Sequence, residues 1–285
     1  ISIGVSRQTG ASLAARADFV HARGRDQLMT RDLNPGVRVD TTRTGAVTRL
    51  DPDFATSVLE LVNLGRTDYD ALEVQIEKRY SHNFSGRVSY TLAYSRGNTA
   101  GGGSPQILLQ SLDDLRLDGN QGPTDFDRRH NFVVSGTVQV PRTGGLTISS
   151  IARAISGLPF SLIDSSTDPD RNGILFDFLP AGWYRGNGPN GIPVGYNGGR
   201  NGGYGPGMFQ LDLRVGYRLF KDGDRALDLF GEIFNVSDRP AFENPITMVL
   251  GHPASDRRMT DFLVVRSLRP GAIPRTGQIG VRFGF

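Results

Sequence analysis

Residues 208–220, MFQLDLRVGYRLF, alternate between apolar and polar side chains. One set comprises Phe209, Leu211, Leu213, Val215, Tyr217 and Leu219, and the other comprises Met208, Gln210, Asp212, Arg214, Gly216 and Arg218. Successive side chains of a β-strand point to opposite faces, so this period predicts a strand with one apolar and one polar face. The stretch exceeds the roughly five or six residues usual in globular sheets. It meets the roughly 9–11 residues that a tilted strand needs to cross a bilayer.

The same period of two returns along the whole chain. We predict strands at about 1–9, 13–25, 68–80, 84–97, 127–140, 145–157, 207–220, 225–236 and 276–285. No segment sustains the i, i+3, i+4, i+7 spacing of an amphipathic helix. The sequence therefore predicts an all-β protein.

The connections between these strands alternate in length. Short ones lie near residues 10–11, 81–83, 141–144 and 221–224, and long ones span 26–67, 98–126, 158–206 and 237–275. Compact soluble domains rarely contain several long connections without secondary structure. Outer-membrane barrels combine tight periplasmic turns with long extracellular loops. We therefore predict a transmembrane antiparallel up-and-down β-barrel, with the last strand running toward the periplasm.

The composition excludes several classes of protein. The 285 residues include 37 glycines and no cysteine, and the mean hydropathy is −0.29. No apolar run approaches the roughly 18–20 residues of a transmembrane helix, and disulfides and cysteine-based metal sites are excluded. A net charge of +3 is too balanced for a nucleic-acid-binding protein. A low hydropathy fits a soluble glycine-rich extracellular β protein, but it also fits a barrel, whose strands alternate and whose loops are polar.

Both ends of the chain contribute expectations. The sequence starts at Ile1 inside an alternating pattern, and nine strands is an odd number for a bacterial barrel. We expect residues 1–285 to be the C-terminal part of a larger barrel. In the last strand, a polar residue, a glycine and two aromatics (Gln278, Gly280, Phe283 and Phe285) look like the signal read by the barrel assembly machinery. The alternative is an ordinary terminal strand.

Three stretches carry a family resemblance: YDALEVQIEKR at 69–79, DFDRRHN at 125–131 and GEIFNVSDRPAFENP at 231–245. With the terminal strand, they resemble the C-terminal barrel of TonB-dependent outer-membrane receptors, and within these the Oar-like branch. The resemblance implies a 22-stranded barrel that is plugged by an N-terminal domain and energised by TonB through a short N-terminal box. Neither plug nor box is part of these residues.

One candidate metal site stands out. Asp168, Asp170 and Asn172, followed by Gly173, match the opening of a calcium loop, in which oxygen ligands alternate before a glycine turn. The bidentate glutamate expected at the twelfth loop position is replaced by Leu179, and Asp177 is out of register. The sequence leaves two interpretations, a calcium site and a polar turn.

Other candidate sites are weaker. The glycine-rich run 182–207 contains four aromatic residues (Trp183, Tyr184, Tyr196 and Tyr204), which suit either ligand stacking or packing of the loop on itself. Arg128–Arg129 and Arg257–Arg258 suit lipopolysaccharide phosphates or internal salt bridges. The four histidines are scattered and no nucleophile motif is present, so we expect no enzymatic activity and no other cofactor.

The strand pattern predicts an inner wall with charges of both signs. Its members are Glu73, Gln75, Glu77, Arg79, Arg129, Asn131, Asp212, Arg214, Arg218, Asp228 and Glu232. We expect them to face a plug or a solute in a transporter whose substrate, siderophore, oligosaccharide or peptide, the sequence does not name. The alternative is a non-transporting surface barrel whose loops bind a partner. Either protein would contact outer-membrane lipid and lipopolysaccharide.

Overall fold

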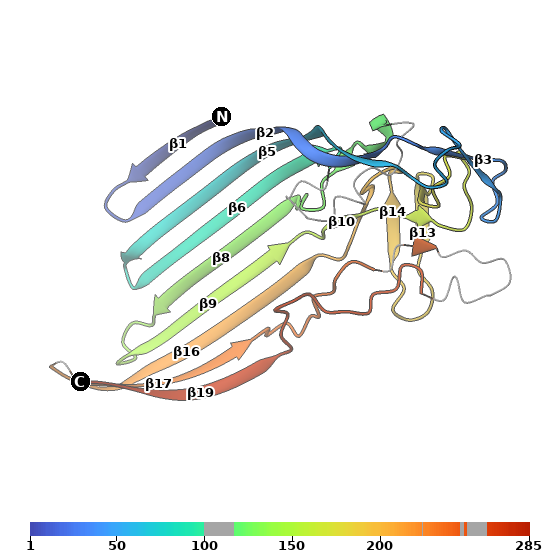
Figure 1. Ribbon diagram of the computed structural model, residues 1–285. Helices are drawn as coiled ribbons and strands as arrows, with labels where there is room; N and C mark the ends of the chain where they lie inside the picture. Colours follow the sequence, from blue (N-terminus) through green and yellow to red (C-terminus); the bar gives the residue numbers. More distant parts are fainter. Residues whose placement is uncertain (100–116, 224, 246–247, 250–260) are drawn as a thin grey trace.

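A single antiparallel sheet dominates the structure, a computed structural model that describes residues 1–99, 117–223, 225–245, 248–249 and 261–285 (Figure 1). Its strands follow chain order: β1 (Ser2–Thr9), β2 (Leu13–Asp32), β5 (Leu59–Ser81), β6 (Phe84–Gly97), β8 (His130–Gln139), β9 (Leu146–Ile155), β16 (Met208–Asp222), β17 (Arg225–Phe234) and β19 (Thr276–Gly284). The short β7 (Gly122–Pro123) adds to β6. All nine predicted strands are present, and the predicted up-and-down order is confirmed.

The turns at one end of the sheet, which we call the turn end, use left-handed backbone. Gly10, His82, Asn83 and Arg142 have φ between 54° and 64°. Asparagine and glycine tolerate this region best, and they supply much of the turn sequence here. At the opposite, loop end, the long connections gather beyond the strands (Figure 1).

Strands β2 and β5 extend well beyond their predicted bounds of 13–25 and 68–80. Their pairing continues through Met29↔Val62 to Asp32↔Leu59, past register shifts that begin after Gly24. Such bulges insert residues that break the alternation of faces. The period of two is lost there although the strand continues, and that is why the sequence pattern ended too early.

The register separates two faces of the sheet. One row of directly opposed residues runs Val138, Ile148, Val215, Gly231 and Ile279 across β8, β9, β16, β17 and β19. The neighbouring row on the other face runs Ser85, Thr137, Ser149, Arg214, Glu232 and Gln278. Opposed residues share a face. The sheet therefore has an apolar face and a polar face, as the alternation predicts.

The apolar face is exposed. Phe19, Leu72, Ile76 and Val215 are each 39–47% exposed, and Ile279 is 84% exposed. An apolar surface of this extent is larger than soluble monomers normally leave in contact with water. Among the described residues, no helix has the length and apolar character needed to cross a membrane.

The long connections are not structureless, which corrects the sequence-based expectation. They contain β3 (Gly36–Arg38), β4 (Val47–Arg49), β10 (Pro159–Phe160), β11 (Ile163–Asp164), β12 (Asp177–Phe178), β13 (Gly182–Arg185), β14 (Pro193–Tyr196), β15 (Gly203–Tyr204), β18 (Met248–Val249) and the 3-10 turn η2 (Leu117–Asn120). Four small sheets form, pairing β3 with β4, β10 with β15, β13 with β14, and β11 with β12 and β18. These strands are two to four residues long and therefore show no detectable period.

A hydrophobic core holds these connections together. It contains Phe160, Leu162, Val194, Tyr196, Phe262 and Leu263, so connections 158–206 and 237–275 share it. Bridges Thr42↔Thr167 and Gly191↔Val264 join further segments. We call the described parts of the long connections, packed in this way, the loop cluster.

Candidate functional site: a polar wall and a packed loop cluster

The polar face of the sheet carries most of the side chains predicted for an inner wall. The register places Glu73, Gln75, Glu77, Asn131, Asp212, Arg214, Arg218, Asp228 and Glu232 on it. Arg79 instead lies at the register shift between Lys78 and Ser81, and Arg129 lies in the loop cluster. We call this face the polar wall.

Charges on the polar wall are paired across strands. Arg214 contacts Glu232 at 2.8 Å, and Arg218 contacts Asp228 at 2.7 Å. The Arg214 guanidinium also lies over the Phe230 ring, 4.1 Å from its centroid. Exposed pairs of this kind add little stability, about 0–1 kcal/mol each. They nevertheless fix the directions in which the wall presents its charges.

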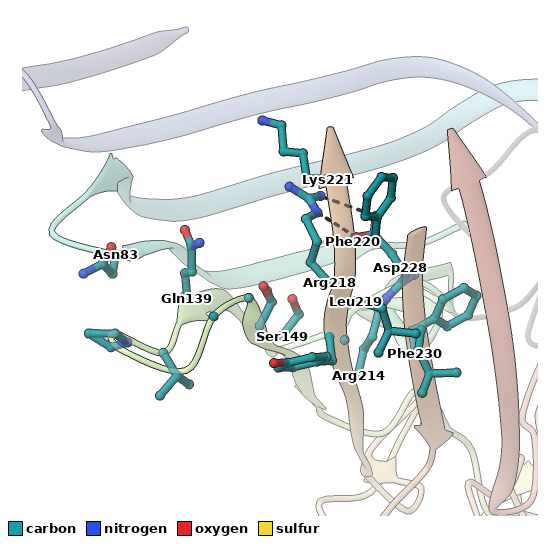
Figure 2. Close-up of a pocket in the computed structure, with 18 of the residues that line it drawn as sticks. Asn83, Gln139, Ser149, Arg214, Arg218, Leu219, Phe220, Lys221, Asp228 and Phe230 are labelled. Atoms are coloured by element: carbon teal, nitrogen blue, oxygen red, sulfur yellow. Dashed lines mark hydrogen bonds and ion pairs between the residues drawn. The ribbon is translucent and has the colours of Figure 1, made fainter. Parts of the chain in front are cut away.

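A hollow of about 950 Å³ lies against the polar wall at the turn end (Figure 2). Its cationic lining residues are Arg142, Arg214, Arg218 and Lys221, and Asp228 is the carboxylate that lines it. Figure 2 shows Arg218 directed at Asp228, with Lys221 beyond it. The hollow is therefore polar and rich in positive charge, as suits contact with an acidic segment or solute.

The DFDRRHN stretch forms the junction between the sheet and the loop cluster. Asp127 is 1% exposed and accepts hydrogen bonds from the Ser95 backbone N (2.7 Å) and the Tyr204 hydroxyl (2.5 Å). Burial, together with the hydrogen bond to Asp127, raises the pKa of Tyr204 to about 12. Arg129 contacts Asp127 at 3.2 Å and lies 3.9 Å from the Tyr94 ring centroid. Of the two roles considered for Arg129, the structure shows the internal salt bridge; Arg257–Arg258 lies outside the described residues.

The GEIFNVSDRPAFENP stretch has a similar anchoring role at the end of β17. Asn235 is 4% exposed and has a left-handed φ of 49°. Its backbone N donates to Asp212 (2.9 Å), and its side chain donates to the carbonyls of Arg239 (3.2 Å) and Ile273 (3.1 Å). Asparagine combines tolerance of this backbone with an amide that has both donors and an acceptor. One residue thus joins β16, β17 and the segment that leads into β19.

The predicted calcium loop forms an acidic cluster with a different membership. Oxygens of Asp168, Asp170 and Asp177 lie within 4.8 Å of one another. The Asn172 Oδ1 accepts a hydrogen bond from the Ile174 backbone N at 2.7 Å, and its role as a calcium ligand stays a prediction. Asp177, which the motif spacing placed out of register, joins the two other aspartates through the β11–β12 pairing.

The guanidinium of Arg38 already provides a positive charge to this cluster. Arg38 and Asp168 form a buried ion pair at 2.7 Å, with side chains 6% and 0% exposed. The Asp168 carboxylate also accepts from the backbone N of Asn172 (3.0 Å) and of Gly173 (2.9 Å). Three carboxylates are a donor set that suits calcium, but Arg38 neutralises one of them. Calcium binding stays a prediction.

Protonation of Asp177 gives the cluster a pH dependence. Burial, followed by the charges of Asp170 and Asp168, raises its pKa from 3.8 to about 8. The folded carboxyl therefore keeps its proton in a range where the unfolded carboxyl has lost it. The contribution of this carboxyl to the stability of the cluster is therefore fully present below about pH 4, falls as pH rises, and is lost above about pH 8.

We expect amide protection factors in residues 158–206, corrected for intrinsic exchange, to fall between pH 5 and pH 8.5. Asp177→Asn removes the group that titrates, so the variant should show a flat profile. Added calcium would favour the ionised carboxyl and should flatten the native profile only if the cluster binds it. An unchanged slope in Asp177→Asn would contradict this assignment.

The aromatic residues of the glycine-rich run have separate roles. Tyr196 is 3% exposed in the loop core, and Tyr184 packs edge-on against it with ring centroids 6.2 Å apart. Trp183 points the other way and is 83% exposed, opposite Gly195 in the β13–β14 pair. Tyr184 and Tyr196 therefore pack the loop on itself, whereas Trp183 remains accessible to a ligand.

The terminal strand presents its hydrophobic side chains on the apolar face. Phe283 is 58% exposed, Phe285 is 94% exposed, and their rings stack with centroids 6.1 Å apart. Gln278 lies on the polar wall and donates to Glu232. A Cβ at Gly280 would lie 2.4 Å from the Phe230 ring, so only glycine fits beneath that ring without displacing it. A function of these residues as an assembly signal stays a prediction.

Comparisons with known proteins agree with this geometry. The profile of the family described as outer membrane beta barrel domain matches residues 1–262. Two solved structures are similar over 100% of this chain: the outer membrane transporter YddB from Escherichia coli and the ferric-catecholate import receptor Fiu from E. coli K12. Each has 12% sequence identity and a TM-score of 0.50, and the chain covers 32% of the first and 27% of the second.

No curated protein matches the chain. At 12% identity, the two solved structures support the fold alone. The family profile covers most of the chain and agrees with the exposed apolar face and the polar wall. The chain therefore belongs to the outer membrane β-barrel domain family and resides in the bacterial outer membrane.

Proposed function

We propose that the chain forms part of the wall of a TonB-energised outer-membrane transporter. The observation that carries the proposal is the polar row Ser85, Thr137, Ser149, Arg214, Glu232 and Gln278, which crosses six strands without an apolar residue. In a membrane protein a continuous polar face needs water, a solute or a plug against it. The Oar-like motifs and the similarity in fold to an outer membrane transporter and to an import receptor support transport.

The sheet edges support closure into a larger barrel. β1 and β19 each pair on one side within the described residues. Hydrocarbon offers no partner for the backbone groups on the other side, and each unsatisfied group costs several kcal/mol. We propose that further strands complete the barrel, up to the 22 strands of the resembling family, with a plug against the polar wall.

Uptake by cells tests the transport proposal. Strains with and without the gene, each in TonB-positive and TonB-negative backgrounds, would be compared across a panel of iron chelates, oligosaccharides and peptides. Transport predicts at least one compound whose uptake needs both proteins. Reversal of charge in Arg218→Glu, on the wall, should reduce that uptake while surface levels stay normal. Binding of a partner without TonB-dependent uptake of any compound would favour the adhesion function instead.

We also propose that the loop end faces the outside of the cell. Residues 1–285 contain no cysteine, so single cysteines introduced among them report position once any cysteine elsewhere in the protein has been replaced by serine. On intact cells a membrane-impermeant maleimide should label Trp183→Cys in the loop cluster and spare Arg142→Cys in a turn. Permeabilised cells should allow labelling of both. Labelling of Arg142→Cys alone on intact cells would reverse the orientation.

A further inference from the structure

An amphipathic trough lies on the apolar face where the strands reach the loop cluster. One register row there runs Tyr90, Phe132, Ala154 and Phe209 across β6, β8, β9 and β16. Ala154 stands between two phenylalanines, and a hollow of about 480 Å³ lies at this position. The trough exists because the small side chain of Ala154 lies between the larger side chains of Phe132 and Phe209 in this row. Its walls are aromatic, and its floor includes Ala154 and Gly207.

The rim of the trough is polar and cationic. Arg239 and His130 both line it. The His130 Nδ1 lies 2.9 Å from the Tyr90 hydroxyl, and the two rings are stacked. The Arg239 guanidinium lies 5.7 Å from the Phe209 ring centroid, and no carboxylate of the described residues is within ion-pair distance of it. The neighbouring Asp238 is paired with Arg275 at 2.9 Å.

We propose that this trough binds the lipid A part of lipopolysaccharide, with an acyl chain between Phe132 and Phe209 and a phosphate at Arg239. The trough is continuous with the membrane-facing surface, so lipid is what covers it. The loop end places it in the outer leaflet, a placement that rests on the proposed orientation. Arginine binds phosphate through two parallel hydrogen bonds, and an aromatic trough suits a hydrocarbon chain. A phospholipid also carries acyl chains and a phosphate, so the test below compares it directly with lipid A.

Native mass spectrometry of the full-length protein in lipid nanodiscs tests the site. The nanodiscs contain phosphatidylethanolamine with lipid A, with dephosphorylated lipid A, or alone. Ala154→Phe fills the trough, and we expect it to reduce retained lipid A about tenfold, which is the effect of excluding about two methylene groups. Arg239→Gln should abolish the preference for lipid A over its dephosphorylated form while the acyl contact remains.

Ala17→Phe is the matched control. Ala17 also lies on the apolar face, opposed to Val5 and Val74, in the same register row as Ala154 but four strands away on β2, and it does not line the hollow. We expect it to retain lipid A as the native protein does, and heat-modifiable migration on a denaturing gel checks that all three variants are folded. Equal retention in Ala154→Phe and Ala17→Phe would overturn the proposal, as would equal retention of phosphatidylethanolamine and lipid A by the native protein.

This test is independent of transport. If the native protein supported no TonB-dependent uptake, the proposed function would be contradicted. Lipid A retention would be unaffected, because the trough lies on the membrane-facing side of the sheet. Preference for lipid A without uptake would therefore keep the site and reject the transporter. Uptake without any lipid A preference would do the opposite.

Discussion

Removal of Phe285 is expected to lower the amount of folded protein in the outer membrane severalfold. Phe285 is 94% exposed, so its loss removes almost no packing within the chain. A large effect would therefore arise during assembly, when the β19 edge and its aromatic residues are offered for recognition. Phe285→Ala should have the same effect as the deletion. The measurement is the heat-modifiable fraction of the protein in purified outer membranes.

Ile279→Ala is the matched control for this prediction. Ile279 lies on the apolar face of β19, the strand that Phe285 directly follows, and is 84% exposed. A hydrophobic contribution to membrane stability would be shared by both positions, whereas an assembly signal depends on position. Normal levels of the Phe285→Ala protein would reject the signal and leave β19 an ordinary terminal strand.

Loss of the Arg38 side chain is expected to destabilise the loop cluster by about 3–5 kcal/mol, the usual effect of leaving one partner of a buried ion pair uncompensated. The Arg38 guanidinium contacts Asp168 and also donates to the carbonyls of Arg43 (3.0 Å), Gly45 (2.8 Å) and Gly173 (3.2 Å). It therefore joins connection 26–67 to connection 158–206. We expect Arg38→Ala to expose both connections to protease on intact cells while the sheet keeps its heat-modifiable migration.

An exposed ion pair of the same type provides the comparison. Arg275 and Asp238 contact each other at 2.9 Å, and their side chains are 55% and 52% exposed. Exposed pairs contribute about 0–1 kcal/mol, so Arg275→Ala should leave protease resistance nearly unchanged. If Arg38→Ala and Arg275→Ala were equally resistant, the buried pair would not be what holds the two connections together.

Sequence alternation predicted the sheet well because one physical constraint acts on every strand. A residue that faces the membrane is apolar and its neighbour that faces the wall is polar, so each of the nine strands carries its own evidence. The prediction failed where that constraint ends. Beyond Gly24, in the bulged part of β2, apolar and polar residues no longer alternate, so the sequence pattern predicts an end of the strand that is too early.

The loop cluster could not be predicted in the same way because its contacts are long-range. Arg38 and Asp168 are far apart in sequence, and nothing near either residue indicates the pairing. The calcium motif identified Asp168 and Asp170 but missed Asp177, because the β11–β12 pairing and not the spacing of the motif brings it close. The DFDRRHN and GEIFNVSDRPAFENP stretches did carry a signal. Their conformational role as anchors became apparent only from the contacts of Asp127 and Asn235.

The shared core of the loop cluster limits how a protein of this kind changes what it recognises. Phe160, Leu162, Tyr196 and Phe262 come from two connections that bury one another. A single loop transplanted from a relative would therefore arrive without the surface that it packs against. Specificity is expected to be exchanged between such proteins by moving the interlocked loops together, or to change by substitution of outward residues such as Trp183, which the core does not need.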